Sequence, residues 1–161
     1  MRIATFTYQG TEYHGVVTTD GIHPFDRGPD MIDLVRLGLP ELIQLCARTA
    51  KRTKPIGLDQ VQLGPPLQPP TVRDFMTFER HIEGMARGAG DTVPPQWYAQ
   101  PAFYFSNPYS VTGPDEDIPV PPGCTVFDYE LEVAAVIGPP GRDLTPARAR
   151  DHIVGYTLLN D

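Results

Sequence analysis

Acidic side chains alternate with apolar and aromatic ones along residues 127–133, which read FDYELEV. Successive side chains of a strand point to opposite faces, so Asp128, Glu130 and Glu132 would share one face. Carboxylates aligned in this way repel one another unless positive charge lies between them. Mg²⁺, Mn²⁺ and Ca²⁺ prefer oxygen ligands of this kind. The pattern leaves two interpretations open, a divalent-metal site or the solvated edge of an antiparallel sheet.

A histidine lies among acids in a second region. Asp74 precedes a helix predicted over residues 75–87, which carries Glu79, His81 and Glu83. Histidine titrates near neutral pH and is the commonest general base. The alternative is that Asp74 caps the helix and that His81 is an ordinary surface residue.

The elements that position these residues fall into two predicted domains. Nineteen prolines in 161 residues argue against a helical bundle, a coiled coil or a repeat solenoid. Residues 1–26 alternate like short strands and residues 30–50 follow a helical period, which predicts a small N-terminal β-meander domain over residues 1–63. Four prolines within residues 64–70 predict a stiff linker. Residues 71–161 then form a second domain, and the whole chain is predicted to be a β-rich α+β protein.

The strongest strand signal runs over residues 125–137. Its second half is apolar at every position, which predicts burial of both faces. Thr145 and Pro146 predict the start of a helix that ends at His152. A last strand is predicted over residues 154–159.

Charge and composition exclude several classes of protein. The net charge is −7, from 13 basic and 20 acidic residues, so a nucleic-acid-binding face is not expected. The first residues resemble no signal peptide, and no apolar run approaches the ~18 residues of a membrane span. Cys46 and Cys124 are the only cysteines, as in reduced proteins. The sequence predicts a cytoplasmic protein with neither a membrane nor a nucleic-acid partner.

Three motifs, in the expected order, resemble the fumarylacetoacetate hydrolase superfamily. In residues 73–81 an Asp precedes a His by seven positions, residues 128–138 contain Glu-x-Glu, and residues 152–161 close on Asn-Asp. The resemblance covers residues 71–161 and implies the first part of a mixed β-roll with few helices, which the chain would leave unfinished. Residues 1–63 are similar in kind to the small N-terminal domain of many members. If the expressed protein ended at Asp161, we would expect little activity.

The resemblance also implies roles for single residues. His81 would be the general base, and one divalent cation would be bound, Mg²⁺ ahead of Mn²⁺ or Ca²⁺. In some members a Glu three positions after the base orients it, but here that position is Gly84. Glu83 and Glu79 are the candidates for that role, and Tyr104 is similar to a substrate-binding tyrosine. The implied metal ligands are Asp74, Glu130, Glu132 and Asp161.

The implied reaction is hydrolysis of a carbon–carbon bond in an acylpyruvate-like or fumarylacetoacetate-like diketo acid by a homodimeric enzyme. His81 would remove a proton from water, and the hydroxide would attack the distal carbonyl, with Lewis-acid help from the cation. A decarboxylase, hydratase or isomerase of 2-oxo acids on the same metal site is one alternative. The other, from a different class, is a non-catalytic β-rich interaction module with solvated carboxylates.

Overall fold

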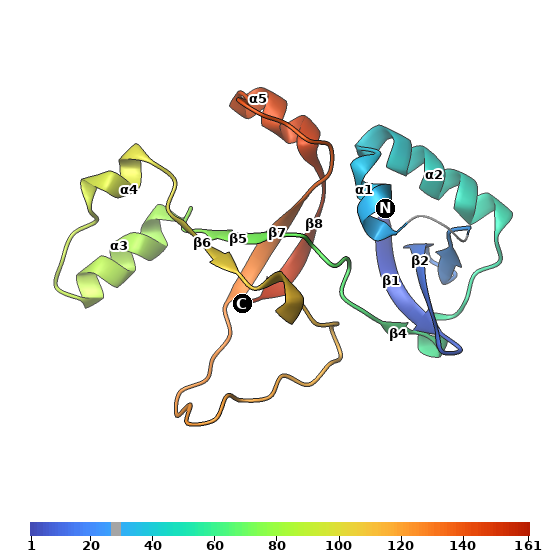
Figure 1. Cartoon of the computed structure of the whole chain (residues 1–161), viewed down its shortest axis with the longest axis horizontal. Coiled ribbons are helices and arrows are strands. Elements are labelled where there is room, and N and C mark those ends of the chain that lie inside the picture. Colours follow the sequence, from blue (N-terminus) through green and yellow to red (C-terminus); the bar gives the residue numbers. More distant parts are fainter. Residues whose placement is uncertain (27–29) are drawn as a thin grey trace. The chain divides into compact units, whose positions relative to one another are not determined.

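The computed structural model describes residues 1–26 and 30–161. Their contacts divide the chain into two compact units (Figure 1). The first unit joins Met1–Gln68 to Thr112–Asp161, and the second is Pro69–Val111.

The N-terminal part of the first unit is a four-stranded antiparallel sheet in the order β3-β2-β1-β4. A tight turn at Gln9 and Gly10, both with positive φ, joins β1 to β2. Such turns match the twist of the strands that they connect. The strands are β1 (Arg2–Tyr8), β2 (Thr11–Val17), β3 (Ile22–Pro24) and β4 (Gln62–Leu63).

Two helices and a short 3₁₀ turn accompany this sheet. They are α1 (Met31–Arg36), α2 (Leu39–Arg52) and η1 (Leu58–Gln60). Pro40 lies in the first turn of α2, where a missing N–H removes no helical hydrogen bond. Among the described residues, the largest fully buried side chains all lie in this part, namely Phe6, Ile22, Met31, Leu34 and Leu42.

The proline-rich segment is held against β1 rather than hanging free. The Thr5 hydroxyl donates a hydrogen bond to the carbonyl of Pro66 at 3.0 Å. Gly64 N–H donates to the carbonyl of Thr5, also at 3.0 Å. Two bonds to one residue fix where this stiff segment leaves the sheet.

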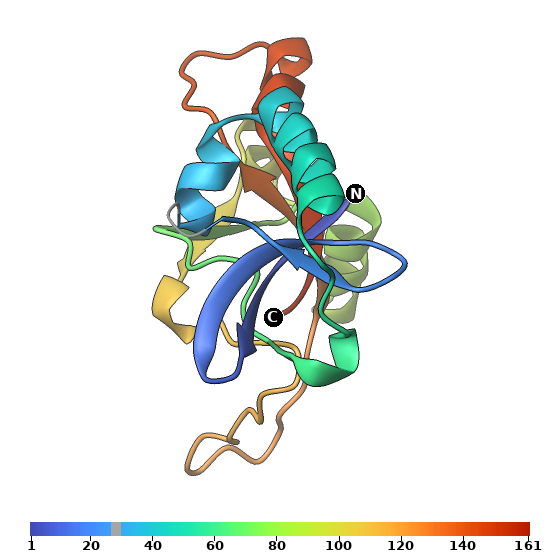
Figure 2. The same cartoon turned by 90° about the vertical axis from the view of Figure 1, so that its right-hand side faces the viewer.

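The other part of the first unit is an antiparallel pair, β7 (Leu131–Ile137) and β8 (Ile153–Asn160). The connection between them holds α5 (Pro146–Ala149) and η3 (Arg150–His152). Val136 and Val154 pack against the same apolar cluster as α1 and α2. Strand β8 therefore runs beside α2 (Figure 2).

The second unit is small and has a two-stranded sheet of its own. β5 (Val72–Phe75) pairs antiparallel with β6 (Phe103–Ser106). Between them lie α3 (Glu79–Gly88) and α4 (Pro95–Ala99), and η2 (Pro108–Ser110) follows β6. Ile82 is the buried residue of α3.

The fold is thus a mixed α/β arrangement with several small antiparallel sheets. The β-roll and the predicted domain limits stay predictions. None of the helices within residues 1–26 and 30–161 is long and apolar enough to span a lipid bilayer.

Several predicted elements differ from the structure. The strand predicted over residues 125–137 begins at Leu131, and the helix predicted from residue 75 begins at Glu79, because residues 72–75 pair as β5. The helix predicted over residues 145–152 is only one turn of α-helix followed by a 3₁₀ turn. The predicted burial of both faces of β7 is also wrong, since Leu131, Val133 and Ile137 are exposed within this chain.

Gly138 lies where the hairpin comes close to α1. A Cβ at this position would overlap the carbonyl oxygen of Val35 and the side chain of Val154. At Gly155, on the neighbouring strand, a Cβ would meet nothing within 4 Å. The hairpin therefore needs glycine at position 138 but not at position 155.

We expect Gly138→Ala to lower the free energy of unfolding by about 1–3 kcal/mol, the usual cost of overpacking. Urea denaturation followed by circular dichroism measures this change. Gly155→Ala is the matched control and should leave the unfolding midpoint nearly unchanged. Equal midpoints for the two variants would contradict the close packing of β7 on α1.

Candidate functional site

The β7–β8 hairpin extends by one residue pair beyond its named strands. Glu130 N–H donates to the carbonyl of Asp161, and Asp161 N–H donates to the carbonyl of Glu130, both at 2.8 Å. Leu131 and Asn160 form the next pair, and Glu132 lies opposite Leu159. The backbone ladder therefore pairs Glu130, just before β7, directly with Asp161, just after β8.

This register places three carboxylates on one face. Residues directly opposite each other on an antiparallel pair point to the same side, and so do residues two apart on one strand. Glu130 and Asp161 therefore share a face with Glu132. Glu132 is half-buried, whereas Glu130 and Asp161 are exposed.

Asp128 does not belong to this group in the way that the alternation predicted. It lies before the ladder begins, and its carboxylate accepts a hydrogen bond from Tyr129 N–H at 2.8 Å. Short acidic side chains compete with strand pairing by bonding to nearby backbone in this way. The expectation that Asp128, Glu130 and Glu132 lie along one strand therefore fails at Asp128.

The three grouped carboxylates fit a hard cation in their chemistry, since each supplies only oxygen donors. Their spacing is looser than a closed metal site. In the described ranges, no three His, Cys, Asp or Glu side chains gather closely enough to hold a metal ion. The hairpin thus supplies the right kind of donors on one face without enclosing a cation by itself.

In the second unit, Asp74 and Tyr104 form a directly opposed pair on β5 and β6. They share a face with Val72 and Ser106. The sequence singled out both residues for different roles, a metal ligand and a substrate contact. The structure brings these two together.

The opposite face of the same two strands is aromatic. The Phe75 and Phe103 rings lie 5.0 Å apart between centroids, and Phe103 and Phe105 lie 5.5 Å apart. The Arg73 guanidinium lies 4.8 Å from the centroid of the Phe105 ring. Aromatic and cation–π pairs of this geometry stabilise cross-strand contacts, so they help to fix the register that opposes Asp74 to Tyr104.

His81 stands in the first turns of α3, with an exposed side chain. Its backbone N–H donates to the carbonyl of Phe78 at 3.0 Å. Gly84 and Gly88 lie on the same side of the helix, three and seven residues later. A Cβ at either glycine would meet nothing within 4 Å, so the imidazole lies beside open space on its own helix.

Neither candidate for the orienting acid faces His81 within α3. Glu79 and Glu83 are each two residues away, and two residues on a helix differ by about 200° in direction. Glu79 also has another partner, because the Tyr98 hydroxyl donates to its carboxylate at 2.9 Å. The helix geometry gives no support to an orienting role for either acid.

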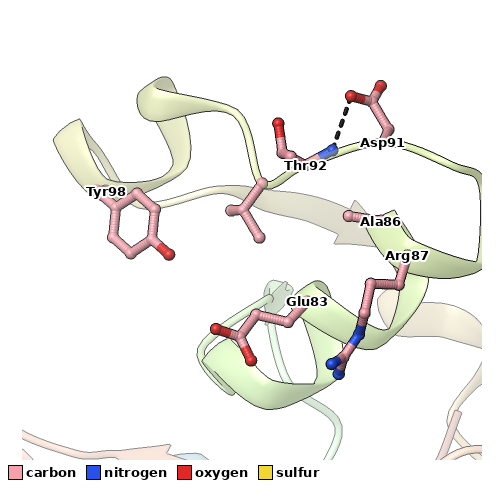
Figure 3. A pocket seen from close by; sticks show the side chains of 7 residues that line it. Glu83, Ala86, Arg87, Asp91, Thr92 and Tyr98 are labelled. Atoms are coloured by element: carbon pink, nitrogen blue, oxygen red, sulfur yellow. Dashed lines mark hydrogen bonds between the residues drawn. The ribbon is translucent and has the colours of Figure 1, made fainter.

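The side of α3 that carries these acids borders a cleft of about 380 Å³ (Figure 3). Arg87 and Asp91 line this cleft, and no sequence motif singled them out. The Glu83 to Arg87 spacing of four residues could have indicated that these two share a helix face. In the described part of the chain the lining consists of Glu83, Ala86, Arg87, Asp91, Thr92, Val93 and Tyr98 and does not include His81.

Comparison with known proteins identifies similar sequences for the region that holds these residues. The family model described as fumarylacetoacetate (FAA) hydrolase C-terminal matches residues 71–161. A Burkholderia multivorans protein, provisionally named a hydrolase, is 37% identical over 90 residues, which is 56% of this chain and 30% of that protein. A Burkholderia cenocepacia protein with a similar provisional name is 36% identical over the same shares.

Two solved structures share the fold. Fumarylacetoacetate hydrolase from psychrophilic Exiguobacterium antarcticum gives a TM-score of 0.66 at 23% identity, over 99% of this chain and 55% of that one. A 2-keto-3-deoxyarabinonate dehydratase gives a TM-score of 0.57 at 17% identity, over 100% of this chain and 56% of that one. The match thus spans 30% of the length of the curated relatives and little more than half of the solved structures.

The Tyr98–Glu79 hydrogen bond predicts the titration of the tyrosine. Donation to Glu79, with the negative charges of Glu79 and Glu83 nearby, raises the pKa of Tyr98 above its usual value. Glu79→Gln should bring the pKa of Tyr98 back down, because the donor then loses its charged acceptor. Titration of ¹³Cζ-labelled tyrosine by NMR measures the change, with Tyr109, which is 87% exposed, as the internal reference. An unchanged Tyr98 titration in Glu79→Gln would contradict the contact.

Proposed function

Because the chain belongs to the fumarylacetoacetate hydrolase family, we propose that it carries catalytic residues of a hydrolase. The proposed substrates are acylpyruvate-like or fumarylacetoacetate-like diketo acids, in which the enzyme cleaves a carbon–carbon bond. The observation that supports this proposal most is the backbone pair between Glu130 and Asp161. It places carboxylates of two strands on one face in the region that the family model matches.

The proposed cofactor is one divalent cation, with Mg²⁺ ahead of Mn²⁺ and Ca²⁺. The ligands proposed for it are Asp74, Glu130, Glu132 and Asp161. The support is chemical, since all four side chains offer only oxygen donors, which hard cations prefer. When bound, the cation supplies Lewis-acid stabilisation of negative charge that develops on substrate oxygen.

The proposed role of His81 is to remove a proton from the attacking water. Its imidazole is exposed and lies beside the open positions of Gly84 and Gly88, so water and substrate can reach it. A general base must come within about 3 Å of the proton donor. Glu79 and Glu83 are not part of this proposal, because α3 directs both away from His81.

Tyr104 is proposed to contact the substrate. It lies directly opposite Asp74, so a ligand of the cation and a phenol hydroxyl come from one pair of strands. A phenol can donate to a carboxylate or carbonyl oxygen of a 2-oxo acid. In the proposed mechanism Tyr104 therefore orients the substrate and does not exchange protons with it. We also propose that the protein acts in the cytoplasm as a homodimer.

A second candidate function is a lyase or isomerase reaction on 2-oxo acids, by the same residues. The observation that favours it is the second structural neighbour, which is named a dehydratase and shares the fold. A product assay separates the two candidates, since hydrolysis of an acylpyruvate yields two acids, whereas dehydration or decarboxylation leaves no such pair.

We expect His81→Ala to lower the kcat of diketo-acid cleavage by about 10²–10⁴-fold, the usual contribution of a general base. The assay uses the protein as it occurs in the cell and follows the loss of the diketo-acid absorbance under saturating Mg²⁺. Arg80→Ala, an exposed neighbour on α3, controls for disturbance of the helix and should keep its activity. Wild-type kcat in His81→Ala would rule out the base role. Release of carbon dioxide, or loss of water from the substrate, without formation of two acids would favour the second candidate.

A further inference from the structure

A second cavity of the smaller unit lies beside α4 and has a volume of about 230 Å³. This is more than a few water molecules need and less than the ~300–1,000 Å³ of pockets that hold a whole drug-sized ligand. The cavity therefore suits one substituent of a small molecule. We call it the Trp97 pocket; among the described residues its wall consists of the apolar Met76, Pro94, Trp97, Pro101 and Ala102 and the polar Gln96 and Gln100.

The Trp97 pocket differs from the neighbouring cleft on α3 in its lack of charge. Glu83, Arg87 and Asp91 line that cleft. In the part of the chain that the structure describes, no acidic, basic or histidine side chain lines the Trp97 pocket. An ionised group that enters apolar surroundings without a counter-charge loses much free energy of hydration. The Trp97 pocket therefore favours an uncharged occupant.

Trp97 adds a hydrogen-bond donor to this wall. Its indole nitrogen is buried, and no described residue accepts a hydrogen bond from it. Buried polar groups without a partner are rare in folded proteins. The residue itself is held in place, because its backbone N–H donates to the Pro94 carbonyl at 3.0 Å and its ring meets the Tyr98 ring edge-on, with 4.9 Å between centroids. A carbonyl oxygen on the occupant would supply the missing acceptor.

The Trp97 pocket continues the strand face that carries Asp74 and Tyr104. Met76 N–H donates to the carbonyl of Ala102 at 3.1 Å, one residue pair beyond the end of the β5–β6 ladder. Met76 lies two residues after Asp74. Ala102 likewise lies two residues before Tyr104, so all four residues share one face. Two residues of a strand span about 7 Å, so a small molecule that contacts Tyr104 at one end can reach the Trp97 pocket with the other.

We propose that the Trp97 pocket binds the distal acyl group of the diketo acid and thereby selects substrates in which this group is uncharged. An acyl group offers an apolar chain to the wall and a carbonyl oxygen to the indole N–H. The inference rests on the proposed function, because it says which diketo acids the same site accepts. It favours acylpyruvates with an alkyl chain over fumarylacetoacetate-like compounds, whose distal group ends in a carboxylate.

The test compares two substrates that differ only at the end of the acyl chain. Hexanoylpyruvate ends in a methyl group, and adipoylpyruvate carries a carboxylate at the same place. We expect the kcat/KM of the wild type to be about tenfold higher for hexanoylpyruvate, because the pocket offers the carboxylate no counter-charge. Gln96→Arg places a cation beside the pocket and should lower this preference about tenfold. Gln44→Arg, the same change at an exposed glutamine of α2, should leave the preference unchanged.

The indole N–H gives a readout that needs no turnover. Trp97 is the only tryptophan of the chain, and the Nε1–H resonance that Trp97→Phe loses identifies it by NMR. In His81→Ala, which should not consume the substrate, hexanoylpyruvate should move this resonance downfield as the hydrogen bond forms. Adipoylpyruvate at the same concentration should leave it nearly unchanged. With active protein, Trp97→Phe keeps an aromatic wall without the donor and should lower kcat/KM for hexanoylpyruvate about three- to tenfold.

The outcomes separate this inference from the proposed function. If neither compound is cleaved, the proposed function is wrong, and the indole resonance alone decides whether the pocket binds the acyl group. If both compounds are cleaved with equal kcat/KM by the wild type and by Gln96→Arg, the proposed function stands and the role of the pocket is overturned. An indole resonance that does not respond to hexanoylpyruvate would also overturn it.

Discussion

The two hydrogen bonds between Glu130 and Asp161 are the constraint on which the candidate site depends. They fix the register so that two carboxylates lie directly opposite each other, with Glu132 on the same face. Like charges in directly opposed positions destabilise an antiparallel pair. A cation that prefers oxygen ligands would convert this repulsion into attraction, because it would lie between the charges that the register brings together.

The rest of the first unit holds that register in place. Val136 and Val154 pack into the core formed with α1 and α2, and Gly138 lets the hairpin approach Val35 closely. A strand pair fixed at one end by packing cannot slip by one residue without turning its buried side chains outward. The N-terminal part of the chain therefore helps to fix the register at the acidic end of the hairpin.

The features that depend on local geometry alone could be predicted from the sequence. The period of two placed Glu130 and Glu132 on one face, and the helical period of residues 30–50 predicted the segment that forms α1 and α2. Prediction failed where a residue can bond either to nearby backbone or to a distant strand. At Asp128 the side chain accepts a hydrogen bond from Tyr129 N–H, and the residue does not join the ladder. The opposition of Asp74 and Tyr104 depends on pairing between distant segments, and no local pattern encodes a register of that kind.

The most direct measurement is a titration of the protein with Mn²⁺, followed by electron paramagnetic resonance of the free ion. One tightly bound Mn²⁺ per chain is expected for the wild type, and Asp161→Asn or Glu132→Gln should weaken binding at least tenfold. Glu12→Gln, an exposed acid on β2, should bind as the wild type does. Binding that is absent in the wild type, or equally strong in Asp161→Asn, would contradict a cation held by the carboxylates of the hairpin.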